Sequence, residues 1–511
     1  MPNAQSVPVT PVEIPILGQN NRDPLSQMDP RTAQFINNFM PEQRSLNLRG
    51  GWKIHTTISG VDTIMALGTY QSTSLFAYCD MTSGNHTIYD VTTTTASSAE
   101  VTDSATGDLA YPANTANLLY FMTNKSSSHS TEYRYYNGSS WVDWGFQESS
   151  SDIGGYVVTH YKGRPYIFRG YNMYWGSTIG SVTGSTNLVD LSSLFRISGR
   201  VAAAGILAGP SESANELYLA LFSNWGEVLV YAGDNPEATN WELIGQFKVA
   251  PLLLDNAILE YRNDIWIATT TGMVSLRKLF ELGSDTDEEV STSALINPLW
   301  SKLVKQVGIA STRCSLAYWP EENKIFVLLR GSFDAMDTYT AGTHTMFVYN
   351  AYTGAWTTST LALLDSSDFG KLTYFNDGLY LTSANVVMTY DPDSYRDEEY
   401  DDAGTYQTYD GEIYSAYINN NDPHRFKELV QLEPIFETDI ANSNVTFSAA
   451  SDFGRRTTGT VTTNFVTDGY INVPYRTGVK GNYLQWRAAV TSDASSADGF
   501  KLFSMAMGIR A

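Results

Sequence analysis

The stretch from Ile325 to Trp356 contains two short apolar runs, Ile325-Phe326-Val327-Leu328 and Phe347-Val348-Tyr349, and ends in a tryptophan. The first run has six counterparts of similar aromatic and aliphatic composition. They are Leu75-Phe76-Ala77-Tyr78, Leu119-Tyr120-Phe121-Met122, Tyr166-Ile167-Phe168, Leu217-Tyr218-Leu219, Ile265-Trp266-Ile267 and Leu379-Tyr380-Leu381. The second run is matched by Tyr133-Tyr135-Tyr136, Val228-Leu229-Val230-Tyr231 and Val387-Met388-Tyr390, and the tryptophan by Trp141 and Trp241.

The seven first runs begin 44, 47, 51, 48, 60 and 54 residues apart. A degenerate period of this length, with short strands, is typical of propeller blades. One such sheet cannot bury both of its faces alone, so the copies must pack against each other around an axis. The sequence therefore predicts an all-β chain with a β-propeller of six or seven blades.

The composition restricts the partners of the protein. The formal net charge is −22, whereas tight binding to a phosphate backbone needs clustered Lys and Arg that release counterions. An acidic surface would instead repel DNA, which suits DNA that must slide past without specific binding. No apolar run approaches the length of about 18 residues that a membrane-spanning helix needs, so we expect no membrane span.

Cys79 and Cys314 are the only cysteines, and the first 20 residues lack the basic start and apolar run of a signal peptide. We therefore expect assembly in a reducing cytoplasm with both thiols free, the alternative being a Cys79–Cys314 disulfide.

Residues 1–51 are expected to form an extended, proline-rich N-terminal arm, with a short helix from Arg31 to Met40. One interpretation of the arm is a disordered terminus. The other is an arm that docks on a partner, because apolar residues crowd its first half. These candidate docking residues are Val7, Val9, Val12, Ile14, Ile16 and Leu17.

The propeller is expected over residues 52–395 and is interrupted by one amphipathic helix between Ser293 and Val307, which becomes regular at Pro298 and ends at Gly308. Residues 396–407 lie in an acidic run that we interpret as a solvated linker; a calcium loop is the alternative, but Arg396 stands where an EF-hand needs glycine. Residues 408–511 are expected to form a separate antiparallel β-sandwich, with strands at 429–432, 445–448, 470–473 and 484–487.

No catalytic, cofactor or metal site is expected. The six histidines, at positions 55, 86, 129, 160, 344 and 424, are far apart in the sequence and fit surface or turn positions better than metal ligands. Neither a phosphate-binding loop nor a nucleophile elbow is present. Carboxylate pairs are plentiful, so a propeller glycosidase stays an open alternative, but we expect that the protein is not an enzyme.

The order of four segments resembles the tail nozzle proteins of short-tailed phages, a group that includes tail tubular protein B and the packaged-DNA stabilisation protein. The segment from Gln34 to Trp52 resembles the family's opening, although Gly50 stands where the family often has proline. The segments from Ser293 to Val307, Glu322 to Trp356 and Glu433 to Arg455 are similar to its helix, a late blade and a sandwich strand.

The resemblance implies a structural virion protein of the tail, which forms a homo-hexameric nozzle ring beneath the portal and its adaptor ring. Such a ring retains packaged double-stranded DNA, guides its ejection, and contacts other tail proteins such as fibres or a needle. The alternative is a propeller module that binds glycans or a host surface, with clusters such as Tyr135, Tyr136, Trp141 and Trp144 stacking on sugars.

Overall fold

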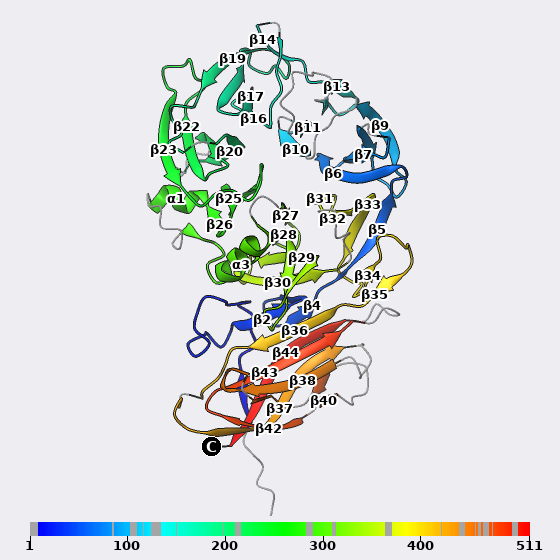
Figure 1. The fold of residues 1–511 in the computed structure, drawn as a ribbon, viewed down its shortest axis with the longest axis vertical. Helices are drawn as coiled ribbons and strands as arrows, with labels where there is room; N and C mark the ends of the chain where they lie inside the picture. The colour runs from blue at the N-terminus through cyan, green and yellow to red at the C-terminus, as the bar shows by residue number, and fades with distance from the viewer. Residues whose placement is uncertain are drawn as a thin grey trace, which may run out of the picture.

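The computed structural model describes residues 9–510 except for 84–85, 103–109, 116, 124–133, 150, 198, 210–215, 283–289, 309–312, 363–369, 421, 439–444, 455, 458–460, 463–469, 473 and 493–498. The N-terminal Val7 and Tyr133 of the second predicted strand run lie outside the described residues. Small β-sheets form a ring at one end of the molecule, and a two-layered β-sandwich stands at the other end (Figure 1).

Six blades of the propeller are separate sheets of mainly antiparallel strands, and the consecutive strands of each blade are given from its innermost strand outward. The first blade consists of β6 (Val61–Tyr70), β7 (Ser74–Met81), β8 (His86–Asp90) and β9 (Ser97–Thr102), and the second of β10 (Ala110–Thr115), β11 (Leu118–Thr123), β12 (Arg134–Tyr136) and β13 (Trp141–Asp143). The third consists of β16 (Val157–Tyr161), β17 (Arg164–Arg169), β18 (Asn172–Gly176) and β19 (Gly184–Asp190). Strands β14 (Phe146–Glu148) and β15 (Ser151–Asp152) extend this third sheet. A further blade consists of β20 (Val201–Ala208), β21 (Leu217–Ser223), β22 (Glu227–Ala232) and β23 (Glu242–Lys248). The next consists of β24 (Ile258–Tyr261), β25 (Asp264–Thr269) and β26 (Gly272–Ser275). The last of the six consists of β31 (Leu372–Phe375), β32 (Gly378–Ser383), β33 (Val386–Asp391) and β5 (Gly51–Thr57).

A seventh blade is the beginning of a ten-stranded sheet. It consists of β27 (Cys314–Trp319), β28 (Lys324–Phe333), β29 (Tyr339–Asn350) and β30 (Ala355–Leu361). The innermost strands contact each other in the order β6, β10, β16, β20, β24, β27, β31 and back to β6, which closes the ring. The ring is also closed along the chain, because β5, the first strand of the propeller, pairs with β33, the last one.

The repeat in the sequence is the second strand of each blade. The seven predicted runs lie in β7, β11, β17, β21, β25, β28 and β32. The runs at Val228, Phe347 and Val387 lie in the third strands β22, β29 and β33. The middle strands of a blade are covered on both faces by the neighbouring blades, so they are apolar throughout, and the predicted propeller is confirmed.

Among the described residues, the long connection between β26 and β27 contains the helices α1 and α3. Helix α3 (Asn297–Val307) follows the sequence prediction, with Pro298 in its first turn and Gly308 at its end. Its buried residues Trp300, Leu303 and Val304 pack into the core between two blades, and the indole Nε1 of Trp300 donates to the Thr269 carbonyl at 2.9 Å. Helix α1 (Leu276–Leu282), which the sequence pattern did not predict, lies against β25 and β26, where that blade lacks a fourth strand.

The sandwich is built from both ends of the chain. One layer contains β1 (Val9–Val12), β3 (Phe39–Pro41), β4 (Leu46–Leu48), β44 (Phe500–Arg510), β37 (Lys427–Thr438), β41 (Tyr470–Asn472) and β42 (Tyr475–Gly481). The other layer continues the ten-stranded sheet through β2 (Ala33–Asn37), β36 (Asp410–Ser415), β43 (Leu484–Thr491), β38 (Val445–Ser451), β39 (Arg456–Thr457) and β40 (Val461–Thr462). Their facing side chains form one core around Trp486 and Phe436.

Two expectations about this part of the chain are wrong. The predicted helix over Arg31 to Met40 is instead the pair of strands β2 and β3, because tertiary pairing with β36 and β4 overrides the local apolar pattern. The sandwich is also not separate, because β2 pairs with β30 of the propeller on one side and with β36 on the other.

Of the five histidines that the structure describes, three are buried, contrary to the surface or turn positions expected for them: His86, His160 and His344 are at most 8% exposed, and His129 lies outside the described residues. His160, on the innermost strand β16, stacks on Tyr120 with ring centroids 5.8 Å apart, and neither of its ring nitrogens has a hydrogen-bond partner. Burial lowers the pKa of His160 from 6.5 to about 4, so the folded protein holds this ring neutral.

This burial predicts a loss of stability in mild acid. The unfolded chain takes up a proton on His160 near pH 6.5 and the folded chain only near pH 4, so the contribution is complete above pH 6.5 and is lost as the pH falls toward 4. The difference between the two pKa values corresponds to a contribution of about 3 kcal/mol at most to the free energy of unfolding. Urea unfolding at pH 7 and pH 4.5 should therefore show a smaller acid effect in His160→Phe than in the wild type. The exposed His424→Gln serves as control, and an equal acid effect in all three proteins would refute the assignment.

Candidate functional site

The axis of the propeller is closed by its own chain. A cavity of about 210 Å³ lies on the axis, lined by residues of β6, β10, β24, β27 and β31 and by the turn at Leu254 to Asn256. Leu254 precedes β24, yet it packs against the core of the β10–β13 and β16–β19 blades across the ring, as well as against its own side. In the part of the chain that the structure describes, the axis therefore holds a small pocket with Leu254 lying across it.

An ion pair anchors this turn. The Arg200 guanidinium contacts the Asp255 carboxylate at 2.5 Å, and Asp255 is only 6% exposed. The backbone of the next residue, Asn256, donates to the Ala202 carbonyl at 2.8 Å. Both contacts tie the turn to the neighbouring blade, so that Leu254 is held across the axis.

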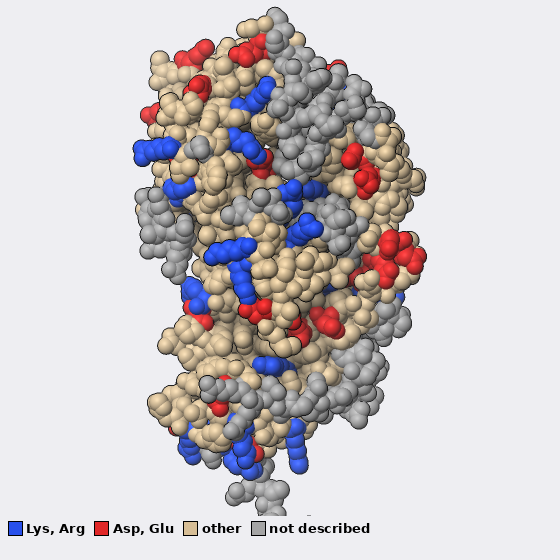
Figure 2. Space-filling view, in the orientation of Figure 1, with Lys and Arg blue, Asp and Glu red and all other residues tan. Residues whose placement is uncertain are grey.

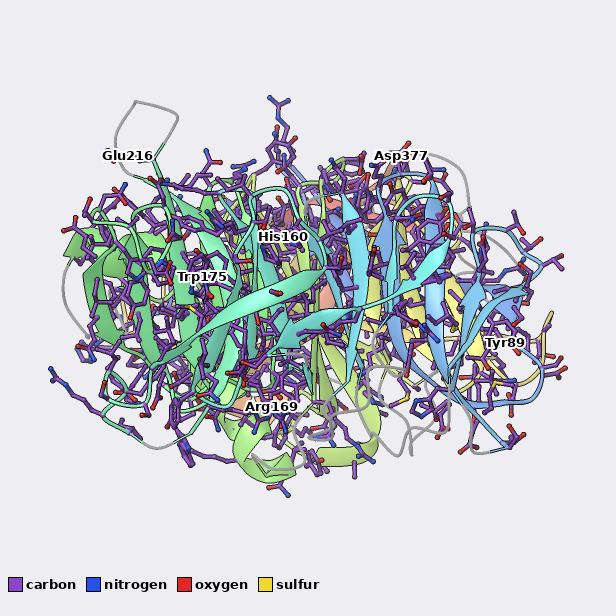
Figure 3. The ribbon with its side chains drawn as sticks, turned by 90° about the horizontal axis from the view of Figure 1, so that it is seen from above. Tyr89, His160, Arg169, Trp175, Glu216 and Asp377 are labelled. Atoms are coloured by element: carbon purple, nitrogen blue, oxygen red, sulfur yellow. The ribbon has the colours of Figure 1, made fainter. Side chains whose placement is uncertain are left out.

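The two faces of the propeller carry different turns. Glu216 and Asp377 lie where first and second strands join, and Arg169 lies at the opposite end of a second strand, with His160 between the two faces (Figure 3). Figure 2 shows Lys and Arg near the middle of one face of the ring, with Asp and Glu mostly toward its rim. The net charge of −22 is thus spread unevenly over the surface.

A buried ion pair lies where the propeller meets the sandwich. Arg49 is fully buried, and its two terminal nitrogens donate to the two carboxylate oxygens of Asp397 at 2.9 and 2.5 Å. Burial acts to lower the pKa of Arg49, but the Asp397 carboxylate outweighs it and the pKa is raised. The guanidinium also lies over the ring of Tyr409, 3.7 Å from its centroid.

The same junction orders the chain on either side. Asp397 accepts from the backbone of Trp52 at 3.1 Å, and Glu398 accepts from Ile54 at 2.7 Å, so both carboxylates hold strand β5. Gly50 and Gly51 pass so close to the backbone of residues 391–396 that no side chain would fit. The segment expected to be a solvated linker therefore contains the short hairpin of β34 (Asp397–Glu398) and β35 (Tyr406–Gln407), with both β34 residues buried. The solvated interpretation is wrong for these two residues.

A polar cleft of about 330 Å³ adjoins this junction. One wall comes from the β28–β29 hairpin, including Phe333 and Asp334, and the other from the sandwich, including Phe35, Asp410 and Glu412. Burial first, and then the carboxylates of Asp410 and Asp334, raise the pKa of Glu412. Pockets at domain junctions with aromatic and polar walls are common ligand sites. No local sequence pattern indicates this cleft, because its walls come from three distant segments.

The structure places the described residues of the N-terminal arm on their own chain. Strand β1, which includes Val9 and Val12, pairs antiparallel with β44, and Ile14 is buried in the sandwich core. Val12 and Ile16 pack against the same core, and Leu17 donates its backbone N–H to the Arg31 carbonyl at 2.9 Å. From residue 9 onward, the arm is therefore ordered without any partner chain. The surface on which it docks is the sandwich of its own chain.

Neither a metal site nor a disulfide is found in the part of the chain that the structure describes. No group of three or more His, Cys, Asp or Glu side chains there could hold a metal ion. Cys79 and Cys314 are both free and buried, as expected, and burial raises the pKa of each thiol. No helix among the described residues has the length and apolar character to cross a membrane.

Comparison of the sequence with protein-family models and with curated proteins finds no match.

The buried pair at the junction predicts a strong effect of breaking it. Asp397→Asn leaves the Arg49 guanidinium buried without a counter-charge, which should destabilise the protein by about 3–5 kcal/mol. The double variant Arg49→Met/Asp397→Leu removes both charges and should lose less stability than Asp397→Asn. Urea unfolding followed by tryptophan fluorescence measures both, and a double variant less stable than Asp397→Asn would contradict this account.

The placement of the arm predicts that Ile14 stabilises the sandwich. Ile14→Ala should cost about 2–4 kcal/mol, because Ile14 is only 8% exposed in the core that contains Trp486. The control is Thr10→Ala on the same segment, since Thr10 is exposed. Unfolding without any partner present is the measurement; unchanged stability of Ile14→Ala would mean that the arm does not dock on its own chain.

Proposed function

We propose that this protein is a structural subunit of a short phage tail, a nozzle ring below the portal and adaptor that retains packaged DNA and guides its ejection. The observation that carries the proposal is the continuous junction between propeller and sandwich. The ten-stranded sheet runs from one into the other, and the buried Arg49–Asp397 pair fixes the crossing. A two-part body joined in this way suits a subunit that must keep its shape under the pressure of packaged DNA.

The closed propeller axis is consistent with this role. Leu254 lies across the axis beside a pocket of about 210 Å³, so DNA would pass along the outside of the propeller, in a channel formed between copies of the chain. The acidic composition fits such a channel, because a surface of the same sign as DNA does not bind the phosphate backbone tightly and lets the DNA slide during ejection. The likeness of the sequence to tail nozzle proteins adds to these two points.

Electron microscopy of the purified chain mixed with a portal–adaptor complex tests the proposal. A ring of six copies seated below the adaptor is the expected result, and native mass spectrometry of the same mixture should give the matching stoichiometry. The free protein should not retard duplex DNA at physiological salt. A chain that stays monomeric and unattached at the concentrations of tail assembly would refute the nozzle role.

The cleft beside the junction favours a second candidate, a module that binds glycans on a host surface. Its walls combine aromatic rings, Phe35, Phe333 and Tyr409, with carboxylates and amides, which together suit sugar rings and their hydroxyl groups. Binding of the wild type to immobilised host glycans, lost in Phe333→Ala, would support this candidate over the nozzle ring.

A further inference from the structure

The free end of the sandwich carries an exposed surface of unusual composition. It consists of Arg425, Phe426, Phe453, Arg476, Lys480 and Arg510, and we call it the cationic end. The strand pairing of β37 with β42 and β44 brings Lys480 and Arg510 together on either side of Glu428, whose carboxylate lies 3.6 and 3.9 Å from their charged nitrogens. One carboxylate thus faces two of the four basic side chains, and the surface keeps an excess of positive charge. Lys and Arg gather at this end of the molecule in Figure 2. Phe426 is 54% exposed and Phe453 45% exposed.

Buried or half-buried polar groups hold the loops of the cationic end in place. The Nζ of Lys427, a buried residue, donates to the carbonyls of Asp422 and, at 2.9 Å, Arg425, and lies 3.4 Å from the carbonyl of Asn482. The Asp452 carboxylate accepts from the backbone of Asn482 and Tyr483 at 2.9 and 3.2 Å. The turn at residues 481–483 thus fixes the two loops that present Phe426 and Phe453.

Phe453 is held in a costly conformation. Its φ is 62°, between Asp452 at 47° and Gly454 at 87°, and the left-handed region is rare for a bulky side chain. Such strain costs on the order of 1–3 kcal/mol and often marks a functional contact. The ring contacts the rings of Tyr417 and Tyr483, with centroids 4.9 and 5.0 Å away, and the residue stays 45% exposed. An exposed ring that is already held in place loses little conformational freedom on binding, and aromatic and Arg side chains on one surface favour protein binding.

The charge of the cationic end selects an acidic partner, and the chain itself offers one. The hairpin of β34 and β35 carries Glu399, Asp401 and Asp402 around its tip, with Asp401 and Asp402 exposed. The tip is ordered by the Thr405 hydroxyl, which donates to Asp402 at 2.7 Å, and by Gln407, which donates to Glu399 at 2.8 Å. In one molecule the hairpin lies beside the propeller and the cationic end lies at the far end of the sandwich (Figure 1), so they cannot meet within one copy.

We propose that the cationic end of one copy of this chain binds the acidic β34–β35 hairpin of the next copy. This contact joins two different surfaces, and an interface of this type forms a ring when the rotation between successive copies closes. It rests on the proposed nozzle ring and names the surfaces that join its copies. It also supplies local attraction between chains that repel each other through a net charge of −22.

A charge-swap experiment tests the pairing. Arg425→Glu/Lys480→Glu and Asp401→Lys/Asp402→Lys should each weaken self-association at least tenfold in sedimentation velocity at low salt. In the first variant, two of the four basic side chains of the cationic end become acidic, so the end loses its net positive charge; in the second, two lysines outweigh Glu399 at the hairpin. In a mixture, the unchanged cationic end of the second variant can bind the unchanged hairpin of the first, and the introduced glutamates of the first face the introduced lysines of the second, so both kinds of contact regain an attraction. The mixture should therefore assemble again into alternating rings. Lys278→Glu/Lys305→Glu, which reverses two exposed lysines on α1 and α3, is the matched control and should assemble like the wild type.

The aromatic part has a test of its own. Phe426→Ser should weaken association about tenfold without lowering the urea midpoint, because the ring is half exposed in the single chain. Met336→Ser, at an exposed position remote from the cationic end in sequence and sheet, should change neither quantity.

The outcomes separate this proposal from the nozzle role. Wild-type rings together with normal assembly of both charge variants would overturn the pairing but not the ring. A wild type that never self-associates would overturn both. Binding of the wild type to phosphatidylglycerol vesicles or to duplex DNA, lost in Arg425→Glu/Lys480→Glu while self-association persists, would assign the cationic end to a lipid or nucleic-acid partner and refute our assignment.

Discussion

The contact between Arg49 and Asp397 is the constraint on which the arrangement of the two domains depends. It joins residues 348 positions apart, and both are almost completely buried. Such a pair gains little net stability over an apolar pair, but either charge alone would be very costly there. The pair therefore excludes other arrangements of the two domains. The chain must enter the propeller at β5 close to the point where it leaves the propeller at Asp397, and the Arg49 guanidinium at this point must lie against Tyr409 of the sandwich.

This constraint also explains why the ends of the chain meet. Strand β5 closes the propeller by pairing with β33, and the segment before it contributes β1 to β4 to a sandwich whose other strands come after residue 409. Contacts between the first 50 and the last 100 residues are the least local in the chain, so we expect the propeller blades to form before them. The sandwich depends on the chain's first strands, as Ile14 in its core illustrates.

The sequence predicted the features that rest on local patterns. The seven apolar runs marked the second strands of all seven blades, because those strands are buried on both faces, and Pro298 and Gly308 marked the two ends of α3. Prediction from the sequence failed where contacts between distant segments determine the structure. Phe35, Ile36 and Phe39 have helical spacing, yet pairing with β36 and β4 makes them strands. Asp397 looked like any other acid of its run, and nothing local could reveal a partner at Arg49 or a cleft made by three segments.

The two surfaces of opposite charge are consequences of the same architecture. The buried Asp397 and Glu398 anchor the base of the β34–β35 hairpin, so its remaining acidic residues are presented at a fixed place beside the propeller. The continuous sheet fixes the sandwich relative to that hairpin, and Lys427 and Asp452 fix the loops at its far end. The distance and direction between the acidic hairpin and the cationic end are therefore set within each copy. If these surfaces bind each other, this fixed geometry sets the rotation from one copy to the next, and with it the number of copies that closes a ring.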